Sequence, residues 1–377
     1  MKQQAAVKIL RFPNTAGFLD EAATLRSLGH RNIIRYLDSD VTADGRRYLV
    51  MEYVEGVPIT EYADQKGLSI RNRLSLFLQA CDAIVCAHQY LILHLDIKPS
   101  NMLVSKDGIV KVLDFGIARR LDDGDAEEPL GARSGPYASP EQIQLGRRLG
   151  YAADVYGLGA ILYELLCGHE PFNPYLATGE LERQIAEEVP RPPSEAINHP
   201  KVHLIGPGKY SRVEPEGLAR MRGGCGLPGA RKLLTGDLDR ICLYALRKEP
   251  GRRYKTVDDL RFDIGRVLKG EPPEFAHSSG LGYLAWRTAE QRPLVVAAVV
   301  FAIAASYSQY LVLKSQSASR HASIESRQQI DQVTESTLKV LTEKLRPKLA
   351  SDPRLRRSLE LLDAERKAVA PNPANTR

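Results

Sequence analysis

The chain has 377 residues, 43% hydrophobic and 26% charged, which suits a globular protein with room for more than one structural part. Its formal net charge is +6, but the segment from Lys314 onward carries 13 Lys and Arg against 8 Asp and Glu. Most of the excess therefore lies in the tail, which argues against a nucleic-acid-binding face on the main domain. Five cysteines without a Cys-x-x-Cys pair favour reduced, buried thiols in the cytoplasm over a disulfide framework or a zinc site.

The first predicted elements are a strand and a helix. Ala6-Val7-Lys8 has the pattern of a strand that ends in a basic residue. Apolar residues then recur at helical spacing between Thr15, a candidate N-cap, and Leu28. Glu21 lies on this predicted helix. The alternative interpretation of Ala6-Val7-Lys8 is an ordinary strand that happens to end in one lysine and has no functional role.

Two longer elements follow. The segment 48–56 reads as a buried strand that runs into a turn, and 70–90 as a long helix with a regular apolar face. The helix leads directly into the polar centre of the sequence.

That centre consists of two clusters, residues 94–101 (His-Leu-Asp-Ile-Lys-Pro-Ser-Asn) and, thirteen residues after Asn101, the triplet 114–116 (Asp-Phe-Gly). The runs between them are strand-like, and the turn 106–108 (Lys-Asp-Gly) has hairpin chemistry. A hairpin would place both clusters in one cleft. Phosphoryl transfer needs hard oxygen ligands for a metal and an acceptor for the proton of a hydroxyl, and these residue types provide both.

Four further features of composition or pattern follow along the chain. An acidic run from Asp122 to Glu128 is interpreted as a solvated loop. Residues 190–235 are rich in Gly, Pro and Arg with little periodicity, so we expect a flexible insertion there. Helical patterning returns over 237–245 and 257–268. Residues 293–313 contain no charge, which predicts a transmembrane helix, with a buried or docking helix as the alternative.

The central clusters resemble the catalytic loop and the Asp-Phe-Gly motif of protein kinases. Residues 134–141 (Ser-Gly-Pro-Tyr-Ala-Ser-Pro-Glu) resemble the end of a kinase activation segment, and the likeness extends from Ala6 to about Gly270. Its character is that of bacterial, eukaryotic-like, membrane-anchored serine/threonine kinases. Only seven residues precede Lys8, so we expect a chain truncated before the Gly-rich loop of that family. The Gly-x-Gly-x-x-Gly string at 224–229 follows no strand and is not interpreted as that loop.

The resemblance implies transfer of the γ-phosphoryl group of ATP to Ser or Thr of protein substrates, with Mg²⁺ as cofactor. Asp96 would accept the proton, Lys98 would balance charge on the phosphoryl group, and Asn101 with Asp114 would hold Mg²⁺. The ATP contacts implied are Lys8, Glu21, Met51, Glu52, Val54, Asn101 and Asp114, with Glu21 as the ion-pair partner of Lys8. The supporting residues implied are His94, Phe115, Gly116, Ser134, Glu141, Asp154 and Arg253, with Glu141 paired to Arg253 and Asp154 bracing the catalytic loop.

The implied architecture is α+β, a two-lobed kinase fold with an incomplete small β lobe and a mostly helical large lobe. The expected parts are a kinase domain at 1–270 (small lobe 1–54, large lobe 55–270, insertion about 190–235), a juxtamembrane linker at 271–292, the transmembrane helix at 293–313, and a helical, partly disordered tail at 314–377. The implied partners are protein substrates, a membrane crossed once with the kinase in the cytoplasm, and a second copy bound through the membrane helix and tail, but no nucleic acid.

A pseudokinase or membrane-anchored scaffold with impaired ATP binding is the alternative function. Leu95 stands where many kinases have an Arg that grips a loop phosphate, so we expect activity without activation-loop phosphorylation.

Overall fold

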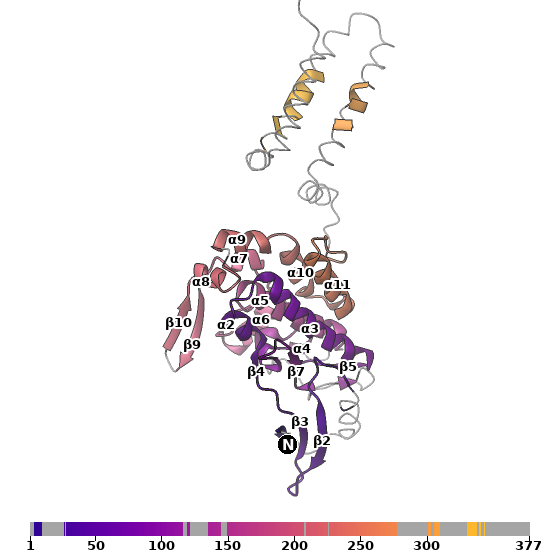
Figure 1. Ribbon diagram of the computed structural model, residues 1–377, viewed down its shortest axis with the longest axis vertical. Coiled ribbons are helices and arrows are strands. Elements are labelled where there is room, and N and C mark those ends of the chain that lie inside the picture. Colours follow the sequence, from indigo (N-terminus) through magenta and orange to yellow (C-terminus); the bar gives the residue numbers. More distant parts are fainter. Residues whose placement is uncertain are drawn as a thin grey trace, which may run out of the picture. The chain divides into compact units, whose positions relative to one another are not determined.

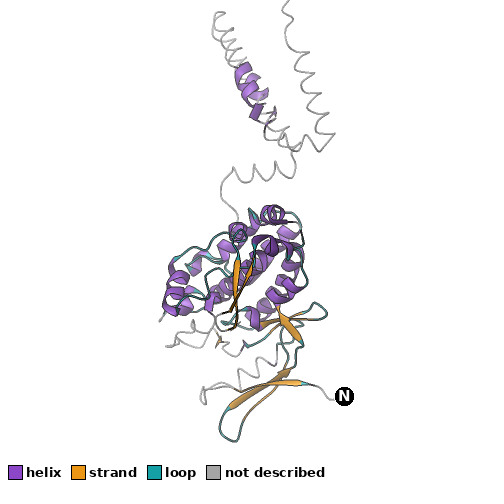
Figure 2. Ribbon diagram, turned by 90° about the vertical axis from the view of Figure 1, so that its left-hand side faces the viewer, coloured by secondary structure: helices purple, strands orange, loops and turns teal. Residues whose placement is uncertain are grey.

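The computed structural model describes residues 4–9, 26, 28–115, 119–120, 135–144, 149–206, 209–224, 226–276 and short pieces between 301 and 343. The chain divides into two compact units, Met1–His277 and Ser278–Arg377. The described residues of the second unit are helical. In the first unit, a sheet of N-terminal strands lies at one end and the helices, with smaller sheets among them, lie at the other, which gives two lobes (Figure 2).

The small lobe is built on an antiparallel sheet in the order β1-β3-β2, formed by β1 (Ala5–Ile9), β2 (Tyr36–Val41) and β3 (Arg47–Glu52) (Figure 1). In β3, Leu49 and Met51 alternate with less buried neighbours, so one face of the strand packs inward. The register pairs Lys8 with Leu49, and this places the lysine at a fixed position on the sheet.

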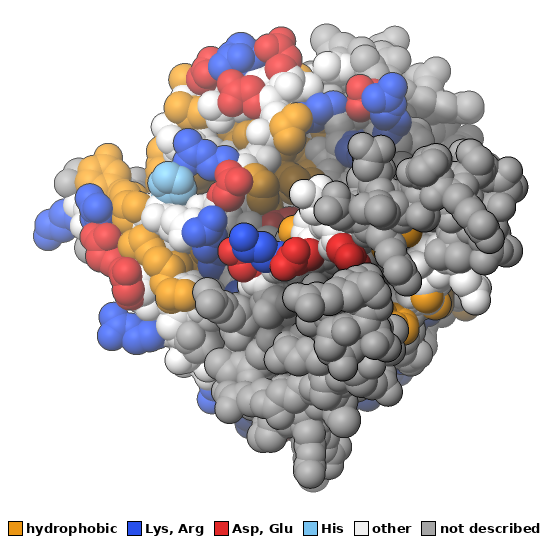
Figure 3. Space-filling view, turned by 90° about the horizontal axis from the view of Figure 1, so that it is seen from above, with side chains coloured by type: hydrophobic (Ala, Val, Ile, Leu, Met, Phe, Trp, Pro, Cys, Tyr) orange, Lys and Arg blue, Asp and Glu red, His pale blue; other side chains and the backbone are white. Residues whose placement is uncertain are grey.

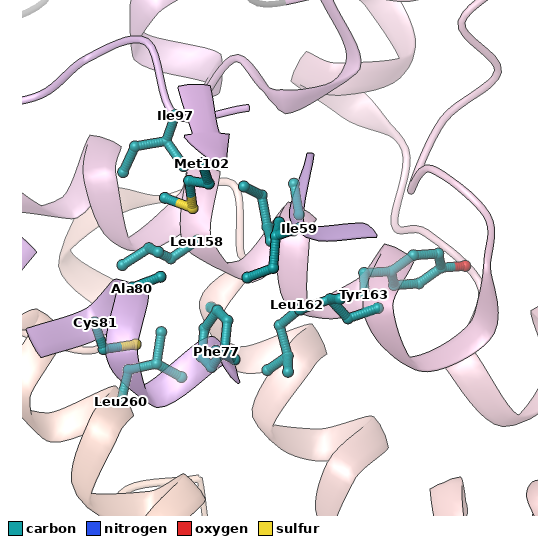
Figure 4. Close-up of a cluster of buried hydrophobic side chains, with 14 of the residues drawn as sticks. Ile59, Phe77, Ala80, Cys81, Ile97, Met102, Leu158, Leu162, Tyr163 and Leu260 are labelled. Carbon is teal, nitrogen blue, oxygen red and sulfur yellow. The ribbon is translucent and has the colours of Figure 1, made fainter. Parts of the chain in front are cut away.

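The large lobe is organised around the helix α5 (Tyr151–Cys167), whose residues are buried from Ala153 to Cys167. The helix ends where Gly168 takes a φ of 91° and donates to Glu164 O at 2.8 Å, as expected of a glycine C-cap. Figure 4 shows Phe77, Leu162 and Leu260 converging from three helices into the same core. The helices of this lobe are α2 (Ile59–Gln65), α3 (Ile70–Gln89), α4 (Pro140–Ile143), α5, α6 (Thr178–Glu187), α7 (Pro193–Ala196), α8 (Pro215–Arg220), α9 (Gly226–Leu234), α10 (Asp237–Ala245) and α11 (Val257–Leu268).

Two small sheets join this helical core to the polar centre. One has the order β4-β6-β7, from β4 (Gly56–Pro58), β6 (Met102–Ser105) and β7 (Val110–Val112). The other pairs β5 (Ile92–Leu93) with β8 (Arg119–Arg120). The segment before β2 contacts β7 through Ile34 N, which donates to Val112 O at 2.9 Å, so the small lobe is attached to the strand pair β6–β7.

The segment 190–235 differs from the flexible insertion that its composition predicted. It contains α7, a hairpin of β9 (Lys201–Gly206) with β10 (Lys209–Val213), α8 and α9. Arg222, 1% exposed, holds this region to the core because its guanidinium donates to the carbonyls of Leu166, Leu218 and Glu164. The Gly, Pro and Arg composition that predicted a flexible insertion therefore belongs to a packed structure.

The expectation of a transmembrane helix is corrected by the structure. Throughout the residues described, no helix has both the length and the apolar character needed to cross a membrane. Of the predicted span 293–313, residues 301–302 and 305–309 are described and the others lie outside the described residues. On the face of the molecule shown in Figure 3, described Lys and Arg side chains are interspersed with Asp and Glu.

Candidate active site

The hairpin predicted between the two polar clusters is confirmed. Strand β6 pairs with β7, with Met102 opposite Val112, and Gly108 closes the turn with a φ of 76°. Leu113 N donates to Asn101 O at 2.8 Å, which places the residue before Asp114 directly against the end of the first cluster. Residues 13 positions apart in the chain thereby share one site.

Asp96, Lys98 and Asn101 form one connected group. Lys98 Nζ lies 2.8 Å from Asp96 Oδ2 and 2.9 Å from Oδ1. Asn101 Nδ2 donates to the carbonyl oxygen of Asp96 at 2.8 Å and to its Oδ2 at 2.9 Å. Both donated bonds of the amide face Asp96, so the carbonyl oxygen Oδ1 of Asn101 is directed away from it. The carboxylate is thus held in one orientation by a cation and an amide.

Asp114 approaches this group from the second cluster in a strained conformation. Its φ is 60°, in the left-handed region that costs a non-glycine residue about 1–3 kcal/mol. Lys8 Nζ contacts Asp114 Oδ1 at 2.8 Å, and both side chains are about one-third exposed. The partner predicted for Lys8 was Glu21, which lies outside the described residues. The ion pair that the structure describes for Lys8 therefore joins the small lobe to the Asp-Phe-Gly motif.

Buried partners fix the catalytic loop from behind, as predicted for Asp154. Its carboxylate accepts from His94 N at 2.9 Å, Leu95 N at 2.8 Å and His88 Nε2 at 2.7 Å. Burial acts to raise the pKa of Asp154, but the hydrogen bond and charge of His88, together with the interactions of His94, outweigh it, and the pKa falls below its usual value. The side chain therefore remains an acceptor at neutral pH. Leu95, with a φ of 59°, depends on this bracing to hold its backbone in the left-handed region.

His94 supports the loop as a neutral ring. Asp96 N donates to its Nδ1 at 3.2 Å, and its Nε2 bonds to Leu113 O at 2.8 Å. Because Nδ1 accepts, Nε2 carries the proton, and burial lowers the pKa of His94 in agreement with that state. His94 thereby links the loop of Asp96 to the strand that presents Asp114.

Phe115 is buried and packs on His94 with ring centroids 4.7 Å apart. Its N–H donates to the hydroxyl of Tyr36 at 3.3 Å. Burial, followed by the charge of Asp114, raises the pKa of Tyr36, so the hydroxyl stays neutral. Tyr36, like His88, was not predicted from the sequence, because a lone aromatic in a strand gives no signal of a polar contact so far along the chain.

The residues expected at the nucleotide base lie at the junction of the lobes. Met51 is buried, Val54 is half-buried, and Glu52 binds Lys111 Nζ at 2.5 Å. Glu52 also accepts from Arg35 N at 3.1 Å, so its side chain ties the lobes together and is engaged by the protein itself. Backbone groups of 52–54 are then what this segment can offer to a base.

The predicted pair of Glu141 and Arg253 is confirmed. Arg253 Nη1 and Nη2 bind the two oxygens of Glu141 at 2.6 and 2.7 Å, and both residues are at most 4% exposed. The same helix start approaches the catalytic loop, because Gln142 Nε2 donates to Leu95 O at 2.6 Å. Gly116 and Ser134, the other predicted supports, lie outside the described residues.

The donor set fits a magnesium–nucleotide complex. Asn101 directs a carbonyl oxygen away from Asp96, and the carboxylate of Asp114 has a second oxygen besides the one bound by Lys8. Mg²⁺ is usually held by one or two protein oxygens together with substrate phosphates, and Lys8 supplies a cation for such phosphates. Asn101 and Asp114 are accordingly the residues that would hold the metal.

Comparison with known proteins agrees with this geometry. A family model described as protein kinase domain matches residues 1–214. The serine/threonine-protein kinase PknB of Mycobacterium tuberculosis is 34% identical over 287 residues, which cover 73% of this chain and 40% of that protein. A probable serine/threonine-protein kinase of Clostridium perfringens is 31% identical over 272 residues, or 70% of this chain and 34% of that protein. The chain thus spans well under half the length of these relatives. Since the family model covers more than half of the chain and its central motifs meet in one site, the chain belongs to the protein kinase family.

Proposed function

We propose that this chain is a serine/threonine protein kinase that transfers the γ-phosphoryl group of Mg²⁺-bound ATP to protein hydroxyls. The observation that carries the proposal is the connected group of Asp96, Lys98 and Asn101, placed by the hairpin beside Asp114. Serine and threonine are proposed as acceptors because the relatives named above are serine/threonine kinases.

Each side chain has a defined task in this proposal. Asp96 accepts the proton of a substrate hydroxyl that comes within hydrogen-bond distance, and its orientation is set beforehand by Asn101. Lys98, already at the Asp96 carboxylate, balances negative charge at the transferred group. Lys8, on the small lobe and next to Asp114, binds phosphate oxygens of the nucleotide. Mg²⁺, when bound, would neutralise charge on the phosphates and fix their orientation.

The cytoplasm is the proposed place of action. ATP is available there, and Cys81, Cys86, Cys167 and Cys242 carry free thiols, as expected in a reducing compartment.

The test compares Asp96→Asn and Asp114→Asn with Asp107→Asn in the full-length chain. Asp107 lies exposed in the turn of the same hairpin, so its variant makes the same chemical change away from the site. Transfer from labelled ATP to casein and to mixed Ser/Thr peptides should fall at least about a hundredfold in the first two variants and stay unchanged in the third. Phosphoamino-acid analysis should find phosphoserine or phosphothreonine.

Binding of Mg²⁺–ATP is measured separately by calorimetry. A wild-type chain that binds Mg²⁺–ATP but phosphorylates nothing would favour the alternative function, a nucleotide-binding scaffold. Transfer that is equal in wild type and Asp96→Asn would refute the assignment of Asp96.

A further inference from the structure

A buried carboxylate on α5 joins two parts of the large lobe that are far apart in the sequence. Glu164 is 8% exposed, and the hydroxyl of Tyr137 donates to its Oε2 at 2.7 Å. Lys201 Nζ donates to the other oxygen, Oε1, at 3.2 Å, and this lysine is also 8% exposed. One carboxylate thus links the short turn η4 (Gly135–Tyr137) to the base of the hairpin β9–β10.

The lysine is held at a fixed point. It pairs with Val213 across the hairpin, and its ammonium also lies 3.5 Å from Glu170 Oε2. The residues just before β9 are fastened to the end of α5, because His169 Nε2 bonds to His199 O at 3.0 Å. The hairpin itself projects from the side of the helical lobe beside α8 (Figure 1).

The charge of Lys201 favours the ionised form of the Glu164 carboxyl group. Burial raises the pKa of Glu164, and the nearby ammonium of Lys201 opposes this effect. Without the ammonium, Glu164 would be a buried carboxylate beside Glu170, and it would tend to take up a proton. A neutral carboxyl accepts a weaker hydrogen bond from Tyr137 than a carboxylate does.

Tyr137 lies in a segment that borders the catalytic loop. After η4, the side chain of Gln142 accepts from Ser139 N at 3.0 Å and donates to Leu95 O at 2.6 Å. Leu95 immediately precedes Asp96, so the segment 135–144 packs next to the proposed proton acceptor. This placement makes the segment 135–144 the part of the large lobe that we expect to contact a protein substrate at Asp96.

We propose that Lys201 is a positioning residue for the protein substrate: it acts through Glu164 to hold Tyr137, and with it the segment 135–144, against the catalytic loop. The proposal rests on the proposed kinase function for its kinetic consequence, but its structural consequence can be measured without any activity.

The structural consequence is tested by amide hydrogen exchange of the full-length chain with peptide-level mass spectrometry. Lys201→Met keeps the apolar stem and removes the charge, and Lys209→Met makes the same change at an exposed position of the same hairpin. In Lys201→Met, amides of 135–144 should exchange about tenfold faster or more, as expected when a charged hydrogen bond is lost, while those of α3 and the β6–β7 hairpin stay unchanged. Lys209→Met should resemble wild type. Equal acceleration in every segment, or none in 135–144, would overturn the proposal.

The kinetic consequence is a change confined to the protein substrate. Lys201→Met should raise KM for a peptide substrate about tenfold while KM for ATP stays within twofold, and Lys201→Arg should restore part of the loss. Tyr137→Phe removes one hydroxyl and should raise the peptide KM in the same way. If both act through Glu164, the double variant Lys201→Met/Tyr137→Phe should be no worse than the stronger single variant.

The outcomes separate the two proposals. A wild-type chain without phosphoryl transfer refutes the kinase function but leaves the hydrogen-exchange test decisive for Lys201. If Lys201→Met does not fold, Tyr137→Phe decides, and an unchanged peptide KM in that variant overturns the role of Tyr137. Additive effects in the double variant, or a parallel rise in KM for ATP, would mean that Lys201 acts by another route.

Discussion

Removal of the Arg253 guanidinium should strongly destabilise the kinase unit. The guanidinium binds both oxygens of Glu141 and donates to the carbonyls of Arg247, Ala152 and Lys248. Arg253→Met leaves the carboxylate of Glu141, whose side chain is 3% exposed, buried without its cation. Breaking a buried pair in this way costs about 3–5 kcal/mol, a large fraction of the roughly 5–15 kcal/mol that stabilises a typical domain.

The measurement is urea unfolding of the full-length chain followed by far-ultraviolet circular dichroism. Arg252→Met is the matched control, because Arg252 is the exposed neighbour and contributes its backbone carbonyl to Arg247. It should change the free energy of unfolding by less than about 0.5 kcal/mol.

A second variant separates the charge from the lost contacts. Arg253→Met combined with Glu141→Met leaves no unpaired buried charge, so the double variant should be less destabilised than the sum of the single variants by at least about 1 kcal/mol. If Arg253→Met unfolds within 1 kcal/mol of Arg252→Met, or if the two single effects simply add, the reasoning from buried charge is refuted.

An added methyl group at Gly157 would lie 2.8 Å from Cβ of Ile97, which is the residue between Asp96 and Lys98 in the chain. Because Ile97 would have to shift and move its neighbours, Gly157→Ala should lower phosphoryl transfer and reduce the free energy of unfolding in urea by about 1–3 kcal/mol. Gly179→Ala, where nothing lies within 4 Å, should instead be neutral or stabilising, and equal effects at the two sites would contradict this argument. Leu95 stands where many kinases have a phosphate-binding Arg, and it is 3% exposed and packs with Leu93 and Ala153, so it offers no cation to a loop phosphate. Phosphatase treatment should therefore leave activity unchanged, and a phosphosite within 117–139 whose removal abolishes transfer would contradict this. Burial lowers the pKa of Lys248 from 10.5 to about 8, so between these values the unfolded chain binds more protons and the contribution of Lys248 to stability rises with pH. Lys248→Met should flatten that rise in urea unfolding between about pH 8 and pH 10, and identical pH profiles would disprove the shift.

The sequence by itself determined the parts of the site that depend on neighbours in the chain. The turn at Gly108 and the strand-like runs beside it predicted a hairpin, because turn chemistry and short-range register are local properties. That hairpin was enough to bring Asn101 and Asp114 together. The pairing of Glu141 with Arg253 was also anticipated, but from resemblance to a family, since no local property connects residues 112 positions apart.

Tertiary structure alone decided which distant groups meet. Lys8 contacts Asp114, Glu52 contacts Lys111, and the hydroxyl of Tyr36 receives a bond from Phe115. Each contact joins segments whose separation in space is set by how the lobes pack, and a pattern along one chain carries no measure of that distance.

The segment 190–235 shows the same limit most clearly. Its Gly, Pro and Arg content and weak periodicity predicted a flexible insertion, yet Lys201 and Arg222 are almost completely buried there. A basic residue is predicted from sequence to be exposed, because burying its charge is costly unless the fold supplies hydrogen-bond acceptors or an opposite charge. The partners here are Glu164 and the carbonyls of α5, and only the folded chain brings them to these two residues.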